Sequence, residues 1–247
     1  MMEVVITMAG IGSRFKKAGY QVPKYQIEAC GRTLFEWSME SLAGLYEESN
    51  TYFFIVRRED DASGFITEKC RAAGIRNFRV IELDKQTDGQ ATTAMLAKEY
   101  WNKSEPLLIY NIDTYVEAGE MQTEQFAGDG FIPCFHAEGN HWSFVKLDGE
   151  GNAVEVREKQ RISDNCTLGA YYFKSCGLYE RLYEEFYSGN GNLEKGEKYV
   201  APLYNYLIGQ GGEVRISVID KKKVHVLGTP EELQVFQNEY QNCQSAE

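Results

Sequence analysis

Residues 4–15 read Val-Val-Ile-Thr-Met-Ala-Gly-Ile-Gly-Ser-Arg-Phe, and Lys24 follows ten residues after Arg14. An apolar run that ends abruptly in a glycine-rich, cation-bearing loop indicates a phosphate-binding loop at the carboxyl end of a first strand. Side chains at Gly10 and Gly12 would block the approach of main-chain amides to phosphate oxygens or forbid the dihedral angles required. Arg14 can then neutralise phosphate charge as a planar fork, and Lys24 as a movable point charge.

Composition and charge exclude several classes of function. A length of 247 residues suits one large α/β domain, and a hydrophobic content of 43% supplies a full core. The formal net charge of −11 argues against a general nucleic-acid or membrane-surface binder, because no basic field attracts polyanions. The one dense basic run, at 221–223, is expected to be a solvated turn between two strands.

Cysteine usage and the absence of targeting signals favour a cytoplasmic protein with reduced thiols. The cysteines show no C-x-x-C spacing and are expected to behave as small hydrophobes: Cys30, Cys70, Cys134, Cys166, Cys176 and Cys243. Three histidines are too few and too dispersed for a zinc site. We see no signal-peptide pattern and no apolar run near the roughly 20 residues that a membrane helix needs.

Short apolar runs alternate with helix-like segments in the first half of the chain. Strands are expected at 3–8, 51–57, 78–83 and 106–112, and helices at 33–48, 61–74 and 90–102. The first of these helices carries a capping box at Thr33 and Glu36. The alternation predicts a parallel sheet covered on both faces, with ligands bound beyond the carboxyl ends of its strands.

The rhythm changes after residue 130. Strand-like stretches occur at 131–136, 142–147, 153–158 and 168–173, which indicates an antiparallel or mixed extension of the sheet. Helices are expected at 176–187 and 198–209, and strands at 213–219 and 224–227. A last helix begins with Thr229 as its cap. We therefore expect an α/β fold with three layers, α/β/α, around a mostly parallel, mixed central sheet.

Residues 87–94, Thr-Asp-Gly-Gln-Ala-Thr-Thr-Ala, form a loop of small residues that enters a helix. As structure alone, Thr87 or Asp88 caps this helix and the alanines pack closely. The functional interpretation is a binding surface for a nucleotide base, since small residues let backbone amides reach the edge of its ring. The residues alone leave both interpretations open.

An almost continuous apolar strand ends in the carboxylate of Asp113. Lying across from the phosphate-binding loop, this carboxylate is well placed to hold Mg²⁺, which typically uses one or two carboxylates together with substrate phosphates and water. The structural alternative is an aspartate that caps a turn. In the context of the loop at 10–14 we favour the metal ligand.

Three segments together resemble the nucleotidyltransferase family that joins an NTP to a phosphorylated sugar or alcohol. The first is Met8-Ala9-Gly10-Ile11-Gly12-Ser13-Arg14-Phe15, with Pro23-Lys24-Tyr25 downstream. The second, 89–94, is similar to the family's Gly-x-Ala-x-x-Ala segment, and the third is the pair Glu158-Lys159 before a Gly-x-Tyr-x-Phe strand at 169–173. Asp113 matches the family's metal-binding aspartate. The resemblance covers residues 4–173, with a weaker echo at 224–236.

The resemblance implies a Rossmann-like, GT-A-like nucleotidyltransferase fold and a role for each matching residue. The nucleotide-binding residues would be Met8, Ala9, Gly10, Gly12, Ser13, Asp88, Gly89, Gln90 and Ala91, with Gly89 and Ala91 approaching the base. The catalytic cations would be Arg14, Lys24 and Lys159, and Asp113 would hold Mg²⁺. On the acceptor side, Glu158 would accept hydrogen bonds from hydroxyls, Lys159 would meet phosphate, and Gly169 would allow close passage of the acceptor.

The implied reaction is attack by an acceptor phosphate oxygen on the α-phosphorus of UTP, dTTP or CTP, with Mg²⁺ and release of pyrophosphate. The expected acceptor is a sugar 1-phosphate, and the expected role is capsule or surface polysaccharide biosynthesis. A cytidylyltransferase acting on a small non-sugar phosphate, such as phosphocholine or a phospho-amino acid, is the alternative. The whole chain, 1–247, would be one domain with a nucleotide-binding half, 1–116, and an acceptor-binding half, 117–247. We expect no nucleic-acid or membrane partner and leave a homo-oligomer open.

One position departs from the family pattern. The family usually has a second metal-binding aspartate two residues before a Gly-Thr-Pro step, and here Val226 precedes the step at 228–230. We expect one Mg²⁺ held by Asp113 and the triphosphate to suffice, with substitution by Asp220 or Asp164 as the alternative.

Two other classes of function remain. A glycosyltransferase with a similar sheet would typically want a D-x-D motif, whereas Asn111-Ile112-Asp113 carries only one acid. A non-catalytic nucleotide-binding module is favoured by the missing acid at Val226. Release of pyrophosphate from an NTP and a sugar phosphate would discriminate the transferase from both.

Overall fold

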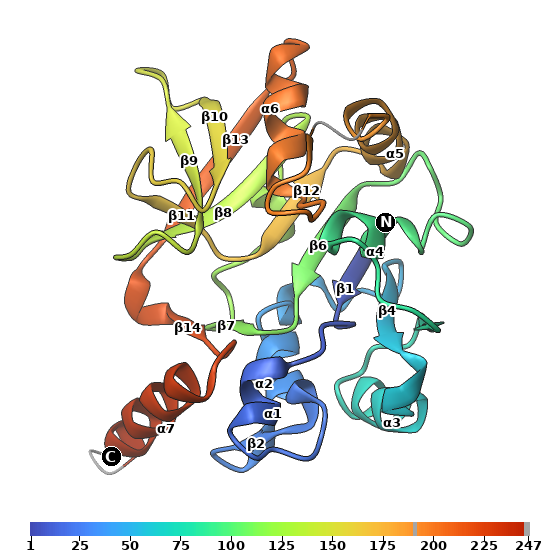
Figure 1. The fold of residues 1–247 in the computed structure, drawn as a ribbon, viewed down its shortest axis with the longest axis vertical. Helices are drawn as coiled ribbons and strands as arrows, with labels where there is room; N and C mark the ends of the chain where they lie inside the picture. The colour runs from blue at the N-terminus through green and yellow to red at the C-terminus, as the bar shows by residue number, and fades with distance from the viewer. Residues whose placement is uncertain (190–191, 245–247) are drawn as a thin grey trace.

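The computed structural model describes residues 1–189 and 192–244, with side chains as far as Tyr240 (Figure 1). Within these residues one large sheet is formed by β1 (Glu3–Thr7), β4 (Thr51–Arg57), β5 (Phe78–Leu83), β6 (Leu107–Asn111), β8 (Gly130–His136), β9 (Ser143–Leu147), β10 (Ala153–Glu158), β11 (Asn165–Thr167), β12 (Ala170–Phe173) and β13 (Val214–Ile219). Two short pairs lie outside it: β2 (Glu28–Ala29) with β3 (Arg32–Thr33), and β7 (Thr114–Val116) with β14 (Val224–Val226). The helices are α1 (Ser13–Lys17), α2 (Leu34–Glu40), α3 (Ser63–Ala72), α4 (Gln90–Met95), α5 (Cys176–Phe186), α6 (Ala201–Gly209) and α7 (Pro230–Gln244).

Helices cover the sheet on both faces. Successive residues of a strand point to opposite faces, and in the central strands the side chains on both faces are apolar and buried. Val4 and Val5 are both fully buried. Val4 belongs to a core cluster that includes residues of α2 and α3, whereas Val5 belongs to a second cluster with residues of α4, α5 and α6. The three-layer α/β/α architecture with a mixed central sheet is thereby confirmed.

The parallel part of the sheet brings the ends of its strands to one edge. β1 lies between β4 and β6 and is parallel to both, so that Thr7 aligns with Ile55 on one side and with Asn111 on the other. In Figure 1 these carboxyl ends point toward α1, α2 and β7. Loops that follow β1 and β6 therefore meet at this edge.

The second part of the sheet is mixed and divides into two branches at β8. β13 pairs in parallel along one side of β8 from Gly130 to Phe135. On the other side β12 pairs with the beginning of β8 and β11 with its end. The branch formed by β11, β9 and β10 consequently separates from the branch formed by β12 and β6, and Figure 1 shows the two on different sides of the molecule.

A third core cluster lies beyond the carboxyl ends of the parallel strands. It joins α1, α2, β7 and α7 through buried apolar side chains, among them Phe15, Trp37, Tyr115, Leu233 and Phe236. The predicted cap of α7 is confirmed, because Thr229 Oγ1 accepts a hydrogen bond of 3.1 Å from the backbone of Glu232. The C-terminal helix is thus held against the loops that follow β1 and β6.

The expected strands and helices are present, with differences in their extent. The helix expected at 33–48 ends at Glu40 and is followed by a separate short 3-10 helix, Ala43–Leu45. The strand expected at 168–173 is β12 preceded by a separate strand, β11, because Gly169 has a left-handed φ of 86° that interrupts the extended chain. The helix expected at 90–102 ends at Met95 and continues as tight turns with i to i−3 hydrogen bonds, such as Leu96 to Thr93. The capping box of α2 is confirmed, and residues 221–223 form the expected turn between β13 and β14.

The five cysteines whose side chains are described are free, and four of them are buried. The side chain of Cys243 lies outside the described residues. In the part of the chain that the structure describes, no helix combines the length and apolar character needed to cross a membrane.

Candidate functional site

The loop after β1 has the geometry that its glycines predict. Met8 is buried and its N–H donates to the carbonyl of Ile55, which fixes the start of the loop. Gly10 has open space where a side chain would be, and Gly12 has a left-handed φ of 65°. Beyond these residues Arg14 is exposed. The loop therefore presents main-chain groups and one guanidinium at the edge where β1 ends.

Lys24 and Asp113 meet beside this loop. Lys24 Nζ lies 2.7 Å from Asp113 Oδ2, and a Cβ on Gly12 would lie 3.7 Å from Lys24 Cβ. Both side chains are part-buried, with 15% of Lys24 and 31% of Asp113 exposed. The structure thus brings together the loop of β1, the lysine after it and the aspartate after β6.

A cluster of polar side chains lies at the ends of β1 and β6. Thr7 Oγ1 donates to Asn111 Oδ1 at 3.3 Å, and the side-chain amide of Gln90 donates to the same oxygen and, at 3.4 Å, to Thr7 Oγ1. Gln90 is thereby oriented by two strands. Sequence reasoning singled out Gln90 but missed Thr7, which carries no motif of its own.

The loop before α4 is packed against a distant part of the chain. Gly89 has a φ of 141°, and a side chain there would strike the main chain of Lys198. Two backbone hydrogen bonds join the segments, from Lys198 to Asp88 at 2.7 Å and from Ala91 to Lys198 at 3.0 Å, and Lys198 Nζ lies 2.9 Å from Asp88 Oδ2. The small residues therefore make room for another chain segment, and the approach of Gly89 and Ala91 to a base stays a prediction.

Glu158 and Lys159 lie at the end of β10, on the other branch of the sheet. The Glu158 side chain is only 8% exposed, accepts a hydrogen bond from Ser143 and lies 3.3 Å from Lys159 Nζ. Lys159 Nζ also donates to the Tyr199 hydroxyl at 2.7 Å. Burial disfavours the ammonium, but this hydrogen bond and the charge of Glu158 outweigh burial and raise the pKa of Lys159. Lys159 is therefore a fixed cation throughout the neutral range.

Gly169 lies where the two branches separate. A Cβ on Gly169 would come within 2.5 Å of Asn111 Nδ2, and Asn111 N–H donates to the Gly169 carbonyl at 3.0 Å. Glycine is required here by both the positive φ and the close approach of Asn111. The residue thus sets the position of the polar cluster, while its contact with an acceptor stays a prediction.

Asp113 fits the ligand chemistry of Mg²⁺. Its carboxylate is partly exposed, and a Cβ on Gly228 would lie 3.5 Å from Oδ2, so that glycine leaves space beside this oxygen. No group of three or more His, Cys, Asp and Glu side chains in the described residues could hold a metal ion by itself. An ion at Asp113 would therefore take its remaining ligands largely from water and, when substrate is bound, from substrate phosphates.

Lys198 and Tyr199 were not among the predicted site residues. These neighbours connect the two sides of the site, since Lys198 contacts Asp88 and Tyr199 contacts Lys159. No motif marks them. Their contacts span 110 and 40 residues of sequence and arise only from the fold.

Comparison with known proteins relates this geometry to an enzyme class. No family model matches the chain, and no curated protein sequence matches it. Among solved structures, it is similar to the nucleoside-diphosphate-sugar pyrophosphorylase from Vibrio cholerae RC9, with 37% identity and a TM-score of 0.88 over 95% of this chain and 99% of that one. It also resembles the inositol-1-phosphate CTP transferase from T. maritima, with 15% identity and a TM-score of 0.74 over 96% and 94% of the chains. For the CTP:phosphocholine cytidylyltransferase from Streptococcus pneumoniae the values are 14% and 0.75 over 97% and 99%.

The two more distant structures share the fold. The Vibrio structure, at 37% identity over almost the full length of both chains, shows the family. The chain belongs to the sugar-phosphate nucleotidyltransferases, as its motifs predicted.

Proposed function

We propose that this protein transfers a nucleoside monophosphate from an NTP to a sugar 1-phosphate and releases pyrophosphate. The observation that carries the proposal is the convergence of the loop at 10–14, Lys24 and Asp113, with Lys24 Nζ 2.7 Å from Asp113 Oδ2 at the edge where β1 and β6 end. The name of the 37% identical Vibrio relative, a nucleoside-diphosphate-sugar pyrophosphorylase, supports a sugar phosphate as acceptor. We propose UTP, dTTP or CTP as the donor.

In the proposed reaction an oxygen of the acceptor phosphate forms a bond to the α-phosphorus, and the bond from that phosphorus to the β-bridging oxygen breaks. A phosphate monoester dianion needs no deprotonation to attack, so no catalytic histidine or cysteine is required. The barrier is mainly charge repulsion and alignment, which fixed cations and positioned amides lower. Arg14, exposed beside the loop, would bind the departing pyrophosphate.

Asp113 would hold Mg²⁺, which when bound supplies positive charge to the triphosphate. Lys24 sits on a flexible stem and can exchange the Asp113 carboxylate for a phosphate oxygen. Lys159 would face the transferred phosphoryl group from the other branch of the sheet, held in place by Tyr199 and Glu158. The nearly buried Glu158 would accept a hydrogen bond from a sugar hydroxyl.

A panel assay tests the proposal. The purified protein with MgCl₂ is mixed with each of the common NTPs and a library of sugar 1-phosphates and other phosphorylated metabolites, and pyrophosphate is measured. We expect release with one pyrimidine nucleotide and a sugar 1-phosphate, and a loss of at least about 100-fold for Asp113→Asn with the thermal midpoint preserved. NTP binding without pyrophosphate from any acceptor would contradict the proposal and favour a binding module.

A role in capsule or surface polysaccharide biosynthesis, a cytoplasmic location and a homo-oligomeric state stay predictions. The acceptor found in the panel tests the role in polysaccharide biosynthesis, because that role predicts a sugar 1-phosphate that is a precursor of surface sugars. Light scattering of the purified chain measures the last.

A further inference from the structure

A second carboxylate lies near Asp113, from the first turn of α7. A Cβ built on Gly228 would lie 3.5 Å from Asp113 Oδ2 and 3.4 Å from Glu232 Oε2. Since both oxygens are this close to one point, they are less than about 7 Å from each other. Glycine at 228 leaves the space between the two oxygens free of a side chain, whereas any other residue would place at least a Cβ there.

The local structure fixes this arrangement. The N–H of Leu227 donates to the carbonyl of Asp113 at 2.8 Å, which ties the start of α7 to the end of β6. Thr229 caps the helix through the backbone N–H of Glu232, so the cap does not depend on the Glu232 carboxylate. Leu233, 1% exposed, anchors the same turn in the third core cluster. Glu232 is thus directed by a rigid turn.

The charges of this pair are incompletely balanced. Asp113 is paired with Lys24. Among the side chains described, as far as Tyr240, the Glu232 carboxylate has no cationic partner and accepts no hydrogen bond. The Glu232 side chain also lines a separate cavity with His225 and Phe236. Two carboxylates this close together with one ammonium leave a negative charge that a divalent cation would neutralise.

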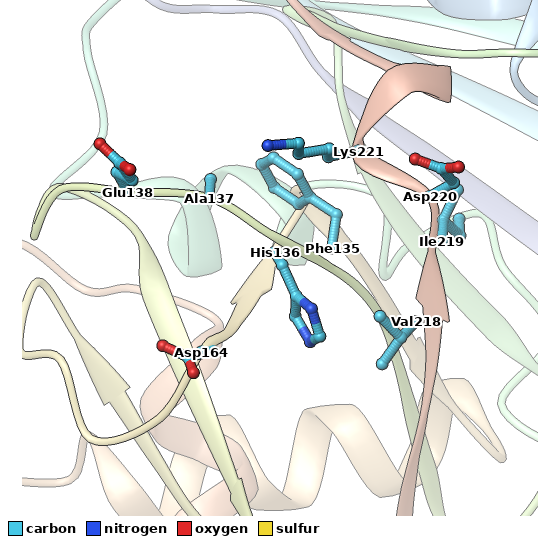
Figure 2. Close-up of a pocket in the computed structure, with 9 residues that line it drawn as sticks. All are labelled: Phe135, His136, Ala137, Glu138, Asp164, Val218, Ile219, Asp220 and Lys221. Carbon is cyan, nitrogen blue, oxygen red and sulfur yellow. The ribbon is translucent and has the colours of Figure 1, made fainter.

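The other candidate acids lie elsewhere. Asp164 and Asp220 line an open cavity of about 830 Å³ with Phe135, His136 and Lys221 (Figure 2). Asp164 is ion-paired with Arg161 at 3.0 Å, and Asp220 accepts a hydrogen bond of 3.0 Å from the backbone of Lys222. Each carboxylate already has a partner in its own loop.

We propose that Glu232 is the second carboxylate for the Mg²⁺ held by Asp113, binding the ion or one of its waters, in place of the acid that the family usually has at the position of Val226. Val226 itself lies in β14 opposite Thr114 and cannot coordinate. The inference rests on the proposed function for the presence of the metal. It assigns the replacement to a residue of the helix rather than of the strand before it.

Direct measurement of Mn²⁺ binding tests this assignment. The full chain is titrated with Mn²⁺ alone, up to millimolar concentration, and the free ion is followed by electron paramagnetic resonance. We expect Glu232→Gln to weaken binding by about tenfold or more, as does Asp113→Asn, because each removes a charged oxygen ligand. The matched control is Glu231→Gln, an exposed neighbour in the same turn, which should bind Mn²⁺ like the wild type.

Two results would overturn the assignment: no Mn²⁺ binding by the wild type, or equal binding by the wild type and Glu232→Gln. A melting curve shows whether Glu232→Gln is folded, and Glu232→Asp, which keeps the charge, should retain most of the binding and serves if the glutamine variant does not fold. Pyrophosphate release by the wild type is measured in parallel. If the wild type releases pyrophosphate while Glu232→Gln binds Mn²⁺ normally, the assignment of Glu232 is wrong but the proposed function stands. If the wild type releases none with any NTP, the proposed function itself fails.

Discussion

Lys24 and Asp113 are 89 residues apart in the sequence, yet their charged atoms lie 2.7 Å apart. Each was predicted from its own motif, and the pairing follows from the rule that parallel strands end at one edge. Thr7, Asn111 and Tyr199 were not predicted as site residues. Their contributions depend on contacts between distant segments, for which a single sequence carries no signal.

Tyr199 is expected to control the charge of Lys159. Its hydroxyl accepts a hydrogen bond from the ammonium and helps to raise the pKa of Lys159, so Tyr199→Phe should lower that pKa. If charged Lys159 is needed for transfer, the alkaline fall of kcat/KM in the variant begins at a lower pH than in the wild type. A pH profile of pyrophosphate release measures this.

The control is Tyr206→Phe, because Tyr206 lies on α6 and packs against Phe186. It should keep the wild-type profile. An alkaline limb at the same pH in Tyr199→Phe and the wild type would show that Lys159 is not tuned by this hydroxyl.

At the scale of elements, the break between β11 and β12 is the feature that shapes the site. The sequence predicted one strand over 168–173 and already singled out Gly169, but not that the sheet divides there. The division depends on β8 pairing with three strands, which no local pattern specifies. Strands of the parallel half were easier to predict, because they are continuous apolar runs between helices.

Gly169→Ala is expected to destabilise the fold by about 1–3 kcal/mol and to lower activity. The new methyl group would meet Asn111 Nδ2 at 2.5 Å in addition to adopting a positive φ. Urea denaturation measures the stability. Gly151→Ala is the matched control, since its φ of 87° is close to that of Gly169 but no atom lies within 4 Å of an added Cβ. Equal losses for the two variants would refute the crowding of Asn111.

The capping box of α2 gives a prediction for stability against pH. Burial would raise the pKa of Glu36, but hydrogen bonds from Thr33 and the ion pair with Lys69 outweigh burial and lower it. A carboxyl with a depressed pKa stabilises the fold above its unfolded pKa of about 4.5, and this contribution is lost as the pH falls through the folded pKa.

Glu36→Gln should therefore cost roughly 1 kcal/mol at pH 7 and less at pH 3. Denaturant unfolding at both pH values measures the difference. Glu28→Gln, at an exposed position of β2, should change stability little at either pH. A loss in Glu36→Gln that is the same at pH 3 would argue against a charged cap.

At the scale of the whole molecule, the alternation of strands and helices predicted the three-layer fold, and the motifs predicted the family. The sequence did not predict where the C-terminal helix lies. α7 returns to the edge where β1 and β6 end and packs with Phe15 and Trp37. That return explains how an acid can approach Asp113 although Val226 replaces the usual one. It depends on the third core cluster, whose members are scattered over the chain.

The central claim is that the nucleoside monophosphate of an NTP, with its α-phosphate, is transferred to a phosphorylated acceptor. We would follow the label of [α-³²P]NTP in the presence of MgCl₂ and the active sugar 1-phosphate. The account predicts that the label appears in a nucleoside diphosphate sugar while unlabelled pyrophosphate forms in equal amount. Label that remains in NTP, or appears only as free NMP or NDP, would contradict it.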